Sequence, residues 1–76
     1  MTKYIVVELQ TDASGAVGNI ITAHDTLNEA ESHFYSILAA AAVSAIAKHA
    51  AVLMTSEGYL VESRCFEHGT EAANVD

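Results

Sequence analysis

One apolar stretch, ILAAAAVSAIAKHAAVLM at residues 37–54, constrains the fold more than any other part of this chain. A transmembrane helix needs about 20 consecutive apolar residues to cross the hydrocarbon core of a bilayer. The run that begins at Phe34 is interrupted at Lys48 and His49, and its many alanines contribute little to membrane insertion. We therefore expect these residues to be buried inside a folded domain and predict no membrane interaction.

A helix is predicted to begin at Thr26. Thr26 and Glu29 have the spacing of a capping box, in which the threonine hydroxyl accepts a hydrogen bond from the amide three residues later. The apolar residues that follow recur at helical intervals: Leu27, Ala30, Phe34, Ile37, Leu38, Ala41 and Ala45. This spacing is then lost, and HAAVLMT is typical of a short buried strand, so we end the helix near Val43 to Ala45.

Three further segments have the composition of strands. KYIVVELQ at 3–10 and NIITAHD at 19–25 are rich in β-branched residues and are joined by TDASGAVG, a loop with two glycines. After the turn TSEG, YLVESRCFEH at 59–68 is the fourth strand. The order β-β-α-β-β predicts an α+β fold, a four-stranded antiparallel sheet with one helix packed on one face. We expect residues 1–68 to form a single domain and residues 69–76 to be an acidic, flexible tail.

One helix covers only one face of such a sheet, so the other face meets solvent or a partner. The first strand has a fully apolar side and a mixed side, and we expect the mixed side, with Tyr4 and Val6, to stay open. Together with Leu60 these residues form a candidate interaction face. A homodimer would bury it, and the small alanines at 39–42 offer a second contact.

Charge and cysteine content narrow the function classes. The 76 residues carry a formal net charge of -7, which disfavours binding to nucleic acid. A single cysteine, Cys65, excludes an intrachain disulfide, so self-association is the expected source of added stability in so short a chain. The N-terminal MTKYIVVEL lacks the pattern of a signal peptide, and we expect a cytoplasmic protein.

Few side chains are candidates for chemistry. Cys65 and His68 form C-x-x-H, which with His24 and His49 could supply zinc ligands, or a thiol nucleophile and its base. Residues three apart on a strand point in opposite directions, so a buried cysteine and a solvent-exposed His68 are the simpler interpretation. Ser44 lacks the G-x-S-x-G context of a hydrolase. We assign no catalytic, cofactor-binding or metal-binding residue.

Three polar residues lie among apolar neighbours in the predicted strands. Glu8 and Glu62 are better explained as solvated or cross-strand ion-paired charges than as an acid-base pair, because so small a domain has little room for a cleft. His49 opens the third strand, and we expect it to bond a carbonyl at the C-terminal end of the helix. All three are therefore interpreted as structural.

Several of these segments resemble a group of short uncharacterised proteins from Gram-positive gut bacteria and their phages or prophages. The similar segments are YIVVELQTDASG, NEAES, AAAVS, H-x-A-V-L and a late E-H, which span most of the chain. Members often have a proline between AAAVS and the histidine, where this chain has Ala45 to Lys48. The resemblance implies a mobile-element origin and, with it, association with virions, but no activity is attached to the group and no site residue is transferred.

The sequence therefore predicts a non-enzymatic interaction or accessory protein that self-associates, without naming a further protein partner. The alternative is an acidic decoy that occupies the nucleic-acid-binding site of another protein, which would require acids spaced like phosphates on one face. A thiol- or metal-dependent activity at Cys65 and His68 is a third hypothesis.

Overall fold

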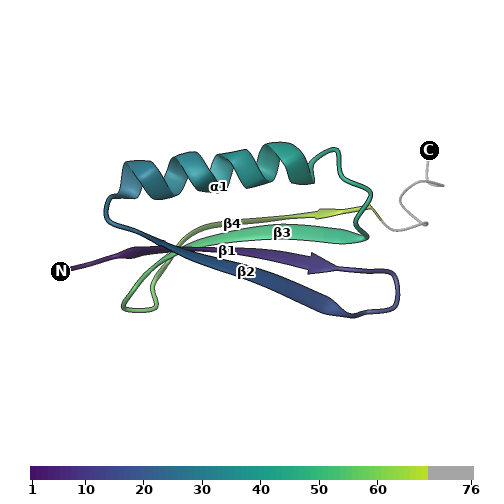
Figure 1. The fold of residues 1–76 in the computed structure, drawn as a ribbon, viewed down its shortest axis with the longest axis horizontal. Helices are drawn as coiled ribbons and strands as arrows, with labels where there is room; N and C mark the ends of the chain where they lie inside the picture. The colour runs from purple at the N-terminus through teal and green to yellow at the C-terminus, as the bar shows by residue number, and fades with distance from the viewer. Residues whose placement is uncertain (69–76) are drawn as a thin grey trace.

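The computed structural model describes residues 1–68 and has one sheet of four strands with a single helix on one face (Figure 1). In chain order the elements are β1 (Tyr4–Thr11), β2 (Val17–His24), α1 (Leu27–Ala41), β3 (Lys48–Thr55) and β4 (Leu60–Glu67). The predicted β-β-α-β-β order and α+β fold class are confirmed. The tail predicted at residues 69–76 lies outside the described residues.

The strand order in the sheet is β2-β1-β3-β4, so the two hairpins meet at β1 and β3. These central strands are antiparallel and pair from Tyr4 opposite Thr55 to Thr11 opposite Lys48. Residues that pair directly point to the same side of the sheet, and successive residues alternate between sides. The register therefore shows on which side of the sheet each regularly paired side chain lies. We call the side that α1 covers the helix side and the opposite side the open face.

The loop between β1 and β2 is organised by Asp12. Its Oδ1 accepts hydrogen bonds from the Ser14 hydroxyl at 2.7 Å and from the Ala16 amide at 3.0 Å, and Gly15 adopts a φ of 95°. These bonds, that of Ser14 first, hold the pKa of the Asp12 carboxyl below its ordinary value. The compact loop lets β2 begin at Val17, earlier than the predicted segment.

α1 begins where predicted and buries one stripe against the sheet. The Thr26 hydroxyl accepts a hydrogen bond from the Glu29 amide at 3.2 Å. The buried helix residues are Ala30, Phe34, Ile37 and Ala41. From the sheet, Val6, Ala51 and Leu53 complete the core, each at most 1% exposed.

The helix ends at Ala41, earlier than the predicted end at Val43 to Ala45. The amide of Ser44 bonds the Ala41 carbonyl at 3.3 Å in the tighter i→i−3 pattern. The same carbonyl lies 2.7 Å from the Nε2 of His68, which follows β4. Because these partners satisfy the last turn, the chain can leave the helix before the apolar sequence itself changes.

The helix covers the side of the sheet that the sequence predicts to be open. Val6 is 1% exposed in the core, and Tyr4 packs against that core. Of the candidate interaction face only Leu60 is exposed, at 64%. The prediction is wrong for Val6 and Tyr4 because it leaves the mixed side of β1, which also carries Glu8, uncovered, whereas Glu8 lies on the helix side with a buried partner in His49.

Candidate functional site

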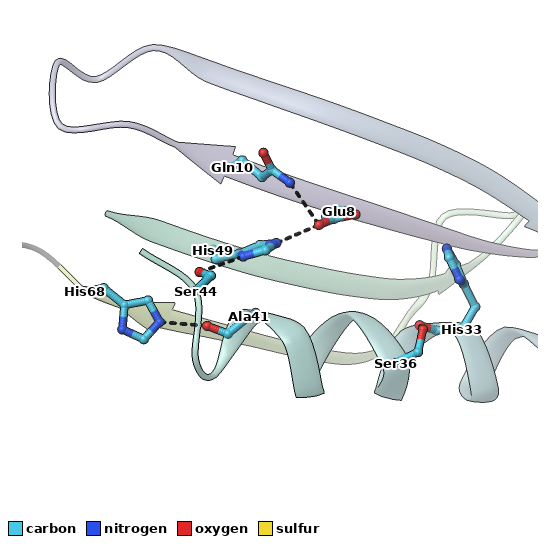
Figure 2. Close-up of polar contacts among 8 residues, drawn as sticks. All are labelled: Glu8, Gln10, His33, Ser36, Ala41, Ser44, His49 and His68. Carbon is cyan, nitrogen blue, oxygen red and sulfur yellow. Dashed lines mark hydrogen bonds and ion pairs between the residues drawn. The ribbon is translucent and has the colours of Figure 1, made fainter. Parts of the chain in front are cut away.

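A chain of polar side chains links β1, β3 and the loop after α1, beneath the C-terminal end of the helix (Figure 2). His49 on β3 is 4% exposed, and its Nδ1 lies 3.0 Å from the Oγ of Ser44 in that loop. Its Nε2 lies 2.6 Å from the Oε2 of Glu8 on β1, and Gln10 donates to the same oxygen at 3.0 Å. In the described part of the chain every buried side-chain nitrogen and oxygen has a hydrogen-bond partner. The core therefore accommodates this polar chain without an unsatisfied group.

The polar chain holds Glu8 in its charged form. The hydrogen bond from His49 is the main cause that lowers the pKa of the Glu8 carboxyl, and the bond from Gln10 adds to it. Burial acts in the opposite direction and is outweighed. Hydrogen bonds to an ionised carboxylate are stronger than those between neutral groups. The bond between Glu8 and His49 therefore stabilises the contact between β1 and β3 beneath the helix.

The order Ser44, His49, Glu8 is similar to a serine hydrolase triad, but its surroundings are those of a structural network. Acyl transfer needs backbone N–H groups aimed at the developing oxyanion. Ser44 follows the C-terminal end of α1, where carbonyls converge, and its own amide already donates to Ala41. The arrangement supports the fixing of loop 42–47 against the sheet rather than catalysis.

Two histidines differ from their predicted roles. His49 is predicted to bond a helix carbonyl, and this is wrong, because its two ring nitrogens contact Ser44 and Glu8. His68 is predicted to be solvent-exposed, yet it is half-buried and its Nε2 lies 2.7 Å from the carbonyl oxygen of Ala41 (Figure 2). The contact predicted for His49 is therefore made by His68, which closes the end of the helix.

Cys65 and His68 are not brought together as a site. Cys65 lies opposite Ala50 on the open face and is exposed, so its predicted burial is wrong, whereas His68 reaches α1 on the helix side. Among residues 1–68, no three His, Cys, Asp or Glu side chains are grouped so that they could hold a metal ion. The described geometry gives these two residues no shared chemistry.

The open face of the sheet is apolar across its two central strands. Eight side chains of β1 and β3 point away from the helix, with Thr11 and Lys48 at one end, and the other six are apolar: Ile5, Val7, Leu9, Ala50, Val52 and Met54. None of these six is charged, and each is half-buried, because its neighbours on the flat sheet shield its flanks. None of the described elements covers this face of the sheet, because α1 lies on the other side (Figure 1).

The outer strands extend this surface and give it a polar end. On β2, Val17 and Ile21 are 60% and 62% exposed, and on β4 Leu60 lies opposite Met54. Lys48 and Glu67 face each other across β3 and β4 at one end of the sheet. We call the six central residues together with Val17, Ile21 and Leu60 the open-face patch.

The open face of the sheet, with the open-face patch at its centre, approaches the size of an interface. Four strands about 4.8 Å apart and about 26 Å long give the whole open face, polar rim included, a flat footprint of roughly 500 Å², and side-chain relief raises its accessible area toward the ~800 Å² per partner of a standard interface. The largest apolar patch on a monomeric soluble protein covers roughly 300–600 Å² and is often functional. This surface, rather than the polar chain, is the candidate functional site.

The prediction from sequence finds Leu60 but misses the rest of the open-face patch. A usable signal is which residues share a side of β1 and which share a side of β3. His49 shares its side of β3 with the buried Leu53, and Glu8 shares its side of β1 with the buried Val6. Pairing the sides that carry Glu8 and His49 beneath the helix leaves the two sides that are apolar except at Thr11 and Lys48 together on the open face.

Comparison with known proteins adds no assignment. The chain matches no family model, no curated protein and no solved structure. Within residues 1–68 no helix is long and apolar enough to cross a membrane. We therefore infer function from the geometry of the open-face patch and of the polar chain.

Proposed function

We propose that this protein is a non-enzymatic interaction module that self-associates through the open-face patch. The observation that carries the proposal is the charge-free apolar surface of the six central residues of the open-face patch, on the face that α1 leaves open, with Lys48 at the end of that face. Packing a second copy there removes apolar area from water at about 25 cal/mol per Å², offset by the entropy cost of association. Only the burial free energy that exceeds this entropy cost appears as affinity. That affinity adds stability to a chain with one small core.

A twofold homodimer suits the shape of this surface. Two flat sheet faces pack about 10 Å apart with their side chains interdigitating, and an isologous interface uses the same patch on both subunits. The charged residues that give the net charge of -7 lie outside the centre of the patch. Two copies can therefore meet there without bringing like charges close together. Lys48 and Glu67 supply both signs of charge at its rim.

The placement of three acidic residues does not favour the decoy hypothesis. Asp12 lies in the loop between β1 and β2, Asp25 pairs with Lys3 at the opposite end of β1, and Glu8 is covered by the helix. These three of the ten acidic residues do not lie on one face with phosphate-like spacing. The resemblance to phage and prophage proteins is compatible with an accessory role for a self-associating module.

The test places charge of either sign at the centre of the patch. Val7 pairs with Ile21 on one side and Val52 on the other, so Val7→Glu and Val7→Lys each put an unpaired charge into the interface. The two variants shift the net charge of -7 in opposite directions. Ser32→Glu and Ser32→Lys, at an exposed position of α1, are the matched controls.

The measurement is sedimentation equilibrium, with circular dichroism to confirm folding. Both Val7 variants should weaken self-association at least about 100-fold, since burying an unpaired charge costs several kcal/mol. Both Ser32 variants should associate like the unmodified chain. If the Val7 and Ser32 variants associate equally, or if only the sign of the charge matters, the open-face patch is not the interface.

A further inference from the structure

The two edge strands of the sheet are protected to different degrees. An edge strand presents unpaired backbone N–H and C=O groups, and natural sheets block such edges with charges and bulges. β4 carries Glu62, Arg64 and Glu67, and its pairing with β3 is irregular at Leu53/Met54. β2 has no charged residue or proline between Val17 and His24, and its register with β1 runs unbroken over all eight pairs.

One exposed apolar residue of β2, Ile20, does not belong to the open-face patch. Ile20 lies opposite Glu8, which places it on the helix side of the sheet, and it is 56% exposed. The helix packs mainly over β3 and β1, so it leaves the outer part of β2 uncovered. Packing of the open faces would not cover Ile20 either, because that packing occurs on the other side of the sheet.

We propose that β2 pairs antiparallel with β2 of a second copy of this chain, joining two sheets edge to edge. A strand that pairs with itself about a twofold axis is self-complementary. With the axis at Ile20, the two Ile20 side chains cover each other, and each Asn19 lies opposite Ile21 of the second copy. An uncharged edge is also the part of a chain of charge -7 that a second copy can approach with least repulsion.

This arrangement has a consequence for the open face. The twofold axis is perpendicular to the sheet, so both helices lie on one side and both open-face patches lie on the other, forming one wider apolar surface. One strand pair covers much less than the ~800 Å² per partner of a stable interface. The edge contact therefore rests on the proposed packing of open faces and joins face-paired dimers into assemblies of at least four chains.

The first test compares Ile20→Lys with Val43→Lys by light scattering. Both positions carry exposed β-branched residues, and Val43 lies after α1, away from both surfaces. Ile20→Lys should reduce the mass from at least four chains of 8.0 kDa to two, while Val43→Lys should leave it unchanged. Val7→Lys should reduce it to one chain, because the edge contact alone is small.

The second test traps the strand pair with cysteines in a Cys65→Ser background. Ile20→Cys places both thiols at the twofold axis, where directly opposed Cβ atoms are about 5 Å apart and a disulfide can form with slight adjustment. Thr22→Cys is the control, since its two copies are displaced by four residues, about 13 Å along the strand. On mild oxidation Ile20→Cys should form linked dimers at least tenfold faster than Thr22→Cys.

The outcomes separate this inference from the proposed function. A mass of two chains for the unmodified protein that Ile20→Lys does not alter would overturn the edge contact and leave the face contact standing. Equal cross-linking of the Ile20→Cys and Thr22→Cys proteins would also overturn it. A mass of one chain for the unmodified protein would overturn both.

Discussion

Replacing Glu8 by glutamine tests the role of the polar chain beneath the helix. The Glu8 carboxylate accepts hydrogen bonds from His49 at 2.6 Å and from Gln10 at 3.0 Å, and an amide of the same shape removes its charge. Hydrogen bonds to a charged group contribute about 1.5–3 kcal/mol, so Glu8→Gln should lower the free energy of unfolding by about 2 kcal/mol at pH 7. In a domain of this size 1 kcal/mol corresponds to a Tm change of about 4–8 °C, which gives a fall of about 8–16 °C.

The effect of Glu8→Gln should depend on pH in a defined direction. The pKa of Glu8 in the folded chain is lowered from its ordinary value of 4.5, chiefly by the hydrogen bond from His49. A carboxyl with a lowered folded pKa contributes stability that is present above the unfolded pKa and lost as pH falls through the folded value. The Tm difference between the two proteins should therefore be full near neutral pH and shrink below about pH 4.5.

The assay is thermal unfolding by circular dichroism at one fixed protein concentration, because self-association also shifts Tm. Glu57→Gln is the control, since Glu57 is exposed in the β3–β4 turn and loses the same charge. It should change Tm by less than about 4 °C, because surface substitutions usually change stability by at most about 0.5 kcal/mol. Equal effects of the two substitutions, or a Glu8→Gln effect that persists undiminished at pH 3, would refute the assigned role of Glu8.

Three further predictions concern the helix ends and the net charge. Thr26→Ala removes the acceptor of the Glu29 amide and should lower the free energy of unfolding in urea by about 1 kcal/mol. Thr26→Ser keeps the hydroxyl and should retain most of that stability, so equal losses in the two variants would contradict the capping role. His68→Ala removes the contact with Ala41 and should also cost about 1 kcal/mol, with increased amide exchange at 42–47; unchanged exchange there would contradict it. Raising NaCl from about 20 to about 300 mM screens repulsion between copies of charge -7 and should strengthen self-association measured by sedimentation, whereas weakening would indicate an interface held by ion pairs.

The features that the sequence predicts correctly are those encoded by neighbouring residues. The helix start depends on Thr26 and Glu29, three positions apart, and the strands on alternation within short segments. The end of the helix is less accurate, because the carbonyl of Ala41 is satisfied by His68, which lies 27 positions away. No local sequence pattern predicts the contact between His68 and Ala41.

The choice of buried face depends on a pair that the sequence does not reveal. Glu8 and His49 are 41 positions apart, and each alone looks like a group that should avoid the core. Once paired and bonded to Gln10 and Ser44, they can lie beneath the helix. That pairing reverses which side of the sheet is covered and so leaves the apolar side, including Val7, without a helix over it.

The most direct test of the proposed self-association is the mass of the unmodified protein, measured by sedimentation equilibrium over a wide concentration series with Val7→Lys alongside it. We predict a mass above the 8.0 kDa of one chain that falls toward that value on dilution, while folded Val7→Lys remains a single chain at the same concentrations. A mass of 8.0 kDa for both folded proteins at every concentration would contradict self-association through the open-face patch.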